Sequence, residues 1–155
     1  MKVKFIKQED FLNYKKPSMF IGTCFCSFKC EKECPECHCQ NSSVAKLPIV
    51  EIADDKIVDM YLNNDITHAI VFGGLEPFDQ EEELLHLISC FREKTDDDIV
   101  IYTGYKEDEV DLRLFYRFDN IIVKFGRYVP NGTAHFDAVL GVSLASDNQY
   151  GKIVC

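Results

Sequence analysis

Continuous apolar runs mark the strongest elements that this chain predicts. They cover Met19–Thr23, Thr67–Phe72, Ile99–Tyr102 and Asn120–Phe125. The runs at Thr67–Phe72 and Ile99–Tyr102 show no alternation of apolar and polar residues, which is typical of a strand buried on both faces of a parallel sheet. Val3–Ile6 predicts a shorter strand at an edge. In the Gly-rich tail, short strands are expected at 136–140 and 152–154.

Between these runs, apolar residues recur at helical spacing. The first helix is expected after Asp54, a residue that can cap it, and before Asn63 and Asn64, which stop it. The second follows Asp79 and Glu82, which have the spacing of a capping box. A third, charged helix is expected over 107–116. Strands that alternate with helices in this way predict βαβ units and an α/β fold with a mostly parallel sheet.

Length and charge narrow the function classes. The chain has 155 residues, enough for one domain over 1–155 with its own core, and a formal net charge of −9. Nucleic acid and anionic membranes are bound by clustered Lys and Arg, so neither is expected as a partner. No apolar run approaches the roughly 20 residues of a spanning helix. Because residues 1–4 open the chain without an apolar stretch, we expect no secretory signal and a cytoplasmic location.

Three unusual segments each follow a predicted strand. They are a cysteine-rich segment at 24–39, the segment Gly73-Gly74-Leu75-Glu76-Pro77, and the segment Tyr102-Thr103-Gly104-Tyr105. In parallel α/β folds, sites lie at the carboxyl ends of the strands. We therefore expect all three segments on one rim of the sheet.

The cysteine-rich segment, called the cysteine loop below, holds six of the eight cysteines. Its intervening residues are too polar to bury six thiols, and dense cysteines in a cytosolic chain favour metal binding over disulfides. Three ligands would leave one corner of an iron–sulfur cube open for a substrate, whereas four would close a cube or a zinc site. The candidate sets are Cys26, Cys30 and Cys39; Cys30, Cys34 and Cys37; and, for zinc, Cys30, Cys34, Cys37 and Cys39.

The glycine segment is compatible with an ordinary turn before a helix, but beside a cluster it predicts a ligand site. Gly73 and Gly74 allow close approach of the backbone, and Glu76 places a carboxylate beside the rigid Pro77. A small ligand with an amine, a carboxylate and a ribose could chelate an open iron and place its amine against this turn.

Together these motifs resemble a known family. Cys-Ser-Phe-Lys-Cys at 26–30, Cys-Gln-Asn at 39–41, Gly-Gly-Leu-Glu-Pro-Phe at 73–78 and Ile-Tyr-Thr-Gly-Tyr at 101–105 are similar to motifs of radical S-adenosylmethionine (SAM) proteins. The likeness is to the activating proteins of anaerobic ribonucleotide reductase, and Asp-Asn-Gln at 147–149 resembles their C-terminal segment. The resemblance implies a shortened, open (β/α) barrel.

The resemblance also implies site roles. Three cysteines would hold a 4Fe–4S cluster whose open iron binds SAM, with Gly73, Gly74 and Glu76 at the methionine end and Tyr102 and Thr103 at the sugar side. A low-potential electron donor would reduce the cluster. SAM cleavage would then generate a glycyl radical on the partner, a glycyl-radical ribonucleotide reductase. The cysteine signature departs from the family's usual Cys-x3-Cys-x2-Cys, and Leu75 precedes the glutamate.

We favour Cys26, Cys30 and Cys39 as the ligands. The Cys30, Cys34, Cys37 set has the commoner spacing, but Cys26–Cys30 directly follows a predicted strand and resembles the first half of the family signature. Loop length does not decide between them, because closing eight residues instead of two costs only about 1 kcal/mol more. Cys34 and Cys37 would then lie in the excursion, as a redox pair or a second metal site.

Two other functions are compatible with the sequence. One is an acidic interaction module in which a zinc ion stabilises the cysteine loop, and the other is an electron-transfer protein with a fully ligated cluster and no SAM. The histidines show no zinc or nucleophile pattern: His68 and His86 are expected at or near the surface, and only His38 could be a ligand. Cys90, in the second predicted helix, is expected to be a buried, inert thiol.

Overall fold

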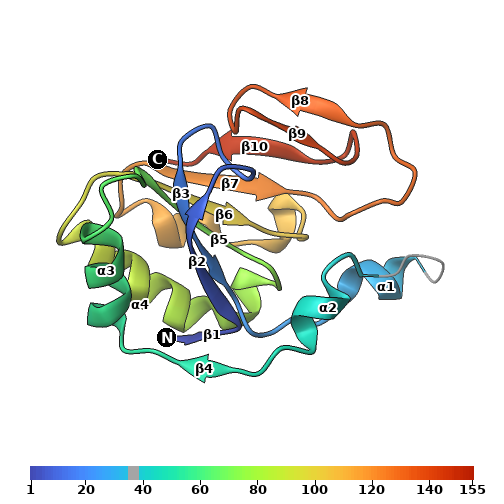
Figure 1. Cartoon of the computed structure of the whole chain (residues 1–155). Coiled ribbons are helices and arrows are strands. Elements are labelled where there is room, and N and C mark those ends of the chain that lie inside the picture. Colours follow the sequence, from blue (N-terminus) through green and yellow to red (C-terminus); the bar gives the residue numbers. More distant parts are fainter. Residues whose placement is uncertain (35–38) are drawn as a thin grey trace.

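A computed structural model describes residues 1–34 and 39–155, and it has a mixed α/β fold built on one central sheet (Figure 1). The six strands of this sheet have the order β10-β7-β6-β5-β3-β2. In chain order they are β2 Phe5–Asp10, β3 Ser18–Gly22, β5 Ala69–Gly73, β6 Asp98–Tyr102, β7 Ile121–Phe125 and β10 Tyr150–Ile153. Strands β3, β5, β6 and β7 are parallel, whereas β2 and β10 join the two edges in antiparallel fashion. The expected mostly parallel α/β sheet is confirmed.

Two short antiparallel pairs lie outside this sheet. β1 (Lys2–Val3) pairs with β4 (Val50–Glu51), and β8 (His135–Asp137) pairs with β9 (Val142–Leu144). The helices are α1 Lys29–Glu33, α2 Ser42–Ala45, α3 Asp54–Leu62 and α4 Glu81–Arg92, with 3-10 turns η1 Pro77–Gln80, η2 Glu107–Glu109 and η3 Leu112–Phe115. Within the described part of the chain, no helix has the length and apolar character needed to cross a membrane.

The helices cover one face of the sheet. Strands β3, β5, β6 and β7 succeed one another across the sheet in a single direction, and right-handed crossovers then place every connection on the same face. Figure 1 shows α3 and α4 together on this side, with the β8–β9 hairpin on the other. Helices therefore cover one face of the sheet, and the C-terminal part of the chain packs on the other.

Alternation along each strand divides the core into two clusters. Ile70 and Phe72 of β5 pack with α3 and α4 residues, among them Ile57 and Leu87. Val71, between them in the sequence, packs on the opposite face in a cluster that includes Leu140 and Leu144. All five β5 residues are buried. The prediction of strands buried on both faces is thus confirmed, and the apolar runs are explained by two cores on one sheet.

Several predicted boundaries agree with the structure. The helix expected before Asn63 is α3, and each of the four apolar runs contains a central strand. The edge strand expected at Val3–Ile6 is divided between β1 and β2, and the tail strands expected at 136–140 and 152–154 correspond to β8 and β10 with shifted ends.

The capping expectations were wrong. Asp79 does not cap α4, because η1 intervenes and the Asp79 carboxylate accepts hydrogen bonds from the Ser27 N–H and the Tyr105 hydroxyl. Asp54 does not cap α3, since Ala53 occupies the N-cap position and no side chain caps it.

The expected helix over 107–116 is two 3-10 turns instead. Glu109 ends the first turn, and its carboxylate accepts the Lys106 N–H at 2.8 Å. Asp111 begins the second by accepting the Arg113 N–H at 3.1 Å. These local side-chain bonds satisfy backbone groups that a continuous helix would have used.

Candidate functional site

The cysteine loop leaves the sheet at the carboxyl end of β3. The Thr23 N–H and hydroxyl both donate to the Gly73 carbonyl, at 2.8 and 2.9 Å, so the start of the loop is bound to the end of β5. Cys24 is buried, and its N–H donates to Gln80 Oε1 at 3.0 Å. Cys24 is therefore a packing residue beneath the rim.

Cys26, Cys30 and Cys39 line one cavity of about 440 Å³. The carboxyl ends of β5, β6 and β7 contribute to the same cavity, as do the segment after α1 and the β9 region. At or just after the strand ends, the cavity is lined by Gly74, Glu76, Tyr102, Thr103, Gly104 and Lys124. The expectation that the three special segments share one rim is confirmed by this common lining.

Hydrogen bonds within the loop bring its two ends together. The Cys26 Sγ accepts the Phe28 N–H at 3.3 Å, and Phe28 takes a left-handed φ of 53° at the start of α1. The Cys39 N–H donates to Glu31 Oε1 at 2.8 Å. Glu31 follows Cys30 directly in α1. This bond therefore holds Cys39, at the end of the loop, close to Cys30.

Burial makes two thiols of this cavity weaker acids. Burial, together with the neighbouring Glu76 and Cys39 charges, raises the pKa of Cys26 to about 11. Burial also raises the pKa of Cys30, in spite of the nearby Arg127 guanidinium. A bound metal would supply the positive charge that turns these thiols into thiolates.

The spacing of the sulfur atoms suits a cluster. Among the described residues, the one His/Cys/Asp/Glu group whose ligand atoms all lie within 4.8 Å of one another is elsewhere in the fold. At least one pair of sulfur atoms among Cys26, Cys30 and Cys39 is therefore more than 4.8 Å apart, farther than two ligands of a single ion. A cubane binds each thiolate through a different iron, so three separated thiols around one cavity fit it.

The other loop cysteines are placed differently. Cys34 is disulfide-bonded and is not among the described residues that line the cavity. Cys37 and His38 lie outside the described residues. The choice of Cys26, Cys30 and Cys39 over Cys30, Cys34 and Cys37 remains a prediction, which the common lining supports.

The three residues predicted from the glycine segment have different environments. Gly74 lines the cavity with a φ of +87°, a conformation that favours glycine. Gly73 lies below it: a Cβ there would stand 3.0 Å from the Phe20 ring and 3.1 Å from Tyr102 Cβ. Close packing thus requires glycine at position 73, whereas Gly74 lines the cavity.

Glu76 joins the ends of β5 and β6. Its Oε1 accepts the Thr103 hydroxyl at 2.7 Å, and its Oε2 accepts the Gly104 N–H at 2.9 Å. Only 4% of the residue is exposed, and this burial raises its pKa to about 7 in spite of these bonds. The Glu76 carboxyl group can therefore hold or release a proton near neutral pH.

Tyr102 and Thr103 both line the cavity as predicted, but their hydroxyl groups are already bonded. The Tyr102 hydroxyl donates to the Asn13 carbonyl at 2.6 Å, while that of Thr103 is bonded to Glu76. Tyr102 therefore offers its ring to the cavity, and Thr103 positions Glu76.

Lys124 is a cavity residue that sequence analysis missed. It is 7% exposed, its Nζ donates to the Gly126 carbonyl at 3.0 Å, and no ion pair to it is found among the described residues. Burial lowers its pKa to about 8, although Glu76 and Cys30 act in the opposite direction. The signal was present, because a lysine interrupts the apolar run of β7. A buried ammonium group in a cavity favours an anionic ligand.

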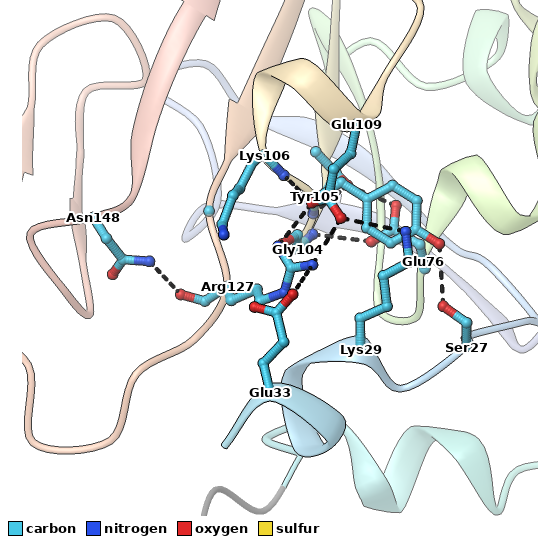
Figure 2. A network of polar contacts seen from close by, with 12 residues as sticks. Ser27, Lys29, Glu33, Glu76, Gly104, Tyr105, Lys106, Glu109, Arg127 and Asn148 are labelled. Atoms are coloured by element: carbon cyan, nitrogen blue, oxygen red, sulfur yellow. Dashed lines mark hydrogen bonds and ion pairs between the residues drawn. The ribbon is translucent and has the colours of Figure 1, made fainter.

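A polar network holds α1 against the rim (Figure 2). The Arg127 guanidinium, 7% exposed, pairs with Glu33 of α1 and with Glu109 of η2, both at 2.8 Å. Arg127 holds the pKa of Glu109 down to about 2. On the other side, Lys29 Nζ lies 3.9 Å from the centre of the Tyr105 ring, and the Tyr105 hydroxyl contacts Ser27 and Asp79. The cysteine loop is therefore fixed by side chains from η1, from the connection between β6 and β7, and from the segment that follows β7.

Comparison with known families shows that the chain is an iron–sulfur protein. Residues 20–132 match the model of a family described as 4Fe-4S single cluster domain. This match covers well over half of the chain and includes the cysteine loop and every strand end of the rim. Neither the curated proteins nor the solved structures contain a significant match to the chain.

Proposed function

We propose that this chain, which belongs to the 4Fe-4S single cluster domain family, is a radical SAM activating protein for an anaerobic ribonucleotide reductase. Its cluster is held by Cys26, Cys30 and Cys39. SAM occupies the rest of the cavity, and the product is a glycyl radical on the reductase. We also propose that the central sheet corresponds to the shortened, open (β/α) barrel that the family resemblance implies.

One observation carries the proposal: three thiols and the carboxyl ends of three parallel strands line the same cavity. Three cysteine ligands leave one iron of a cubane without a protein ligand. A cavity of about 440 Å³ with apolar, acidic and basic groups has the size and polarity of a small-molecule site. An electron carrier needs a ligated cluster but has no use for this additional space.

The polar groups of the cavity are complementary to an amino acid. The Lys124 ammonium group would pair with the methionine carboxylate of SAM, which supplies the missing counter-charge. The Glu76 carboxylate and the turn at Gly74 would face the amino group. Thr103 and the Gly104 N–H keep Glu76 in position, so its orientation does not depend on the ligand.

A 4Fe–4S cluster held by Cys26, Cys30 and Cys39 would, when reduced, supply the electron for reductive cleavage of SAM bound in the same cavity. The protein's residues orient SAM, keep Glu76 and Lys124 paired with its charged ends, and exclude water from the cavity. The products of the proposed reaction would be methionine, 5′-deoxyadenosine and a glycyl radical on the reductase. The described elements form the central sheet and the segments that pack on it. We therefore expect the substrate glycine to belong to the partner protein.

The test is formation of 5′-deoxyadenosine by anaerobically reconstituted, reduced protein with SAM and the reductase. Wild type should form it, and Cys30→Ala, which removes a ligand common to both candidate triplets, should not. Cys155→Ala is the matched control: its thiol donates to the Phe115 carbonyl at 3.1 Å, away from the cavity. No 5′-deoxyadenosine from a fully loaded, reduced cluster would contradict the proposal and favour electron transfer, a function that the family description also allows.

A further inference from the structure

A second group of metal-binding side chains lies on the helix-covered face. Asp54, His86 and Cys90 each offer one ligand atom, and these atoms all lie within 4.8 Å of one another. His86 and Cys90 are four residues apart in α4, so their side chains share one face of that helix. Asp54 comes from the first turn of α3. None of the three has a role in the cavity of the cysteine loop.

The distances approach those of a coordinated ion. His86 Nδ1 lies 2.7 Å from Asp54 Oδ2 and 3.9 Å from Cys90 Sγ. Zinc bonds of about 2.0–2.3 Å at tetrahedral angles would separate neighbouring ligand atoms by roughly 3.4 Å. The two observed distances lie on either side of this value. The His86 side chain is 70% exposed and can therefore shift by the small amount that coordination requires.

We propose that Asp54, His86 and Cys90 bind one Zn²⁺ ion that links α3 to α4. An imidazole nitrogen, a thiolate and a carboxylate oxygen are all zinc ligands, and a water molecule would complete the tetrahedron. Binding releases the proton of the Cys90 thiol. The ion neutralises the Asp54 carboxylate and the Cys90 thiolate, so it leaves no excess charge between the helices.

The surroundings are suited to a cation. The negatively charged Asp54 and Glu93 lie near the Cys90 thiol. The positive group in contact with the site is the amino group of Met1, which donates to Asp54 Oδ1 at 2.5 Å. That bond uses the other carboxylate oxygen, so Oδ2 stays available to the metal together with His86.

The experiment adds Zn²⁺ to anaerobic protein whose cluster has already been loaded, and then counts iron and zinc per chain after desalting. Wild type should retain one zinc ion more than Cys90→Ala or His86→Ala, with the same iron content. Loss of either ligand should weaken zinc binding by at least tenfold in a chelator competition. The X-ray absorption fine structure of the additional zinc should contain one sulfur neighbour among oxygen and nitrogen.

Matched controls separate this site from other thiols and imidazoles. Cys155→Ala and His68→Ala each remove the same group elsewhere and should retain the additional zinc. The exposed His86 can be replaced without disturbing the core, so His86→Ala decides the case if Cys90→Ala does not fold. Equal zinc in wild type and His86→Ala would overturn the proposal, and so would a wild type without additional zinc. Either result leaves the cluster and its SAM chemistry untouched, because the readout is zinc at constant iron.

Discussion

The two faces of the central sheet use the same strands for different purposes. Toward α3 and α4, the strands present apolar residues along their whole length, as Ile99 and Ile101 do in β6 and Phe125 does at the end of β7. Toward the β8–β9 hairpin, the middle of the sheet is equally apolar, with Val71, Val100 and Ile122. The faces differ only at the carboxyl ends, where the second face continues into Tyr102 and Lys124 at the cavity. Stability and chemistry are therefore separated along the strands as well as across the sheet.

This comparison predicts that substitutions will divide into two classes. Changes among the buried residues of the helix-covered face should lower stability and leave the cluster in place. Changes at the strand ends of the open face should alter the cluster or its ligand with little loss of stability.

The largest effect is expected in the cysteine loop. Cys26→Ala/Cys39→Ala should lose the cluster completely, whereas Cys34→Ala/Cys37→Ala should retain one that responds to SAM. The reason is that Cys26, Cys30 and Cys39 line the cavity. Iron and sulfide analysis with absorption spectroscopy after anaerobic reconstitution distinguishes the two. The opposite pattern would assign the cluster to Cys30, Cys34 and Cys37.

Next in size is a core substitution on the helix-covered face. Phe91 is fully buried in α4 and packs edge-on against Tyr61 at 5.6 Å. Phe91→Ala should lower the free energy of unfolding by about 3–5 kcal/mol through lost burial and a cavity. Tyr102→Phe on the open face removes only the hydroxyl bond to Asn13, which is worth about 1 kcal/mol. Urea unfolding of both variants measures the contrast, and similar losses would contradict it.

Lys124→Met should affect both stability and ligand binding. The pKa of Lys124 is about 8 in the folded protein against 10.5 ordinarily, so the unfolded chain binds more protons between these values. The stability of wild type relative to the variant should therefore rise with pH from about 8 to 10.5, by roughly 3 kcal/mol. Unfolding at several pH values measures this rise, and Lys106→Met, an exposed lysine of the same rim, is the control.

The same variant sharpens the functional side of the comparison. Removing the counter-charge of the methionine carboxylate should weaken SAM binding by about 10- to 100-fold, the value of a hydrogen bond to a charged group. Unchanged SAM affinity in Lys124→Met would remove Lys124 from the ligand site.

The smallest effect is expected at the outer end of the polar network. Glu33 is 49% exposed, so its ion pair with Arg127 is screened by water. Glu33→Gln should cost less than about 1 kcal/mol of stability, because Arg127 keeps its bonds to Glu109. Urea unfolding measures the change. A loss above 2 kcal/mol would mean that α1 depends on this pair much more than its exposure suggests.

The sequence predicted the central strands well because they are buried on both sides. Each apolar run from Met19 to Phe125 corresponds to a strand, and the order of strands and crossovers followed from general rules of βαβ units. Polar segments were predicted less well, since their conformation depends on distant partners. Asp79 has the spacing of a helix cap, but Ser27 and Tyr105 take its carboxylate.

The candidate site was also predicted in part. The cysteine loop, Gly74, Glu76, Tyr102 and Thr103 could be brought to one rim because each follows a predicted strand. Lys124 stands out in the apolar run of β7, but it could not be assigned to the site, because the sequence does not say which face of β7 is covered by helices and which opens to a cavity. Only the position of the tail, from Leu140 to Gln149, makes that distinction.

The most direct test of the central claim is electron paramagnetic resonance of the reduced cluster during titration with SAM. If three cysteines are the ligands and the fourth iron faces the cavity, as proposed, one cluster per chain should give a spectrum that shifts to a new form and saturates at one SAM per chain. A fully loaded, reduced cluster whose spectrum is the same at every SAM concentration would contradict the account and leave a protein that carries electrons only.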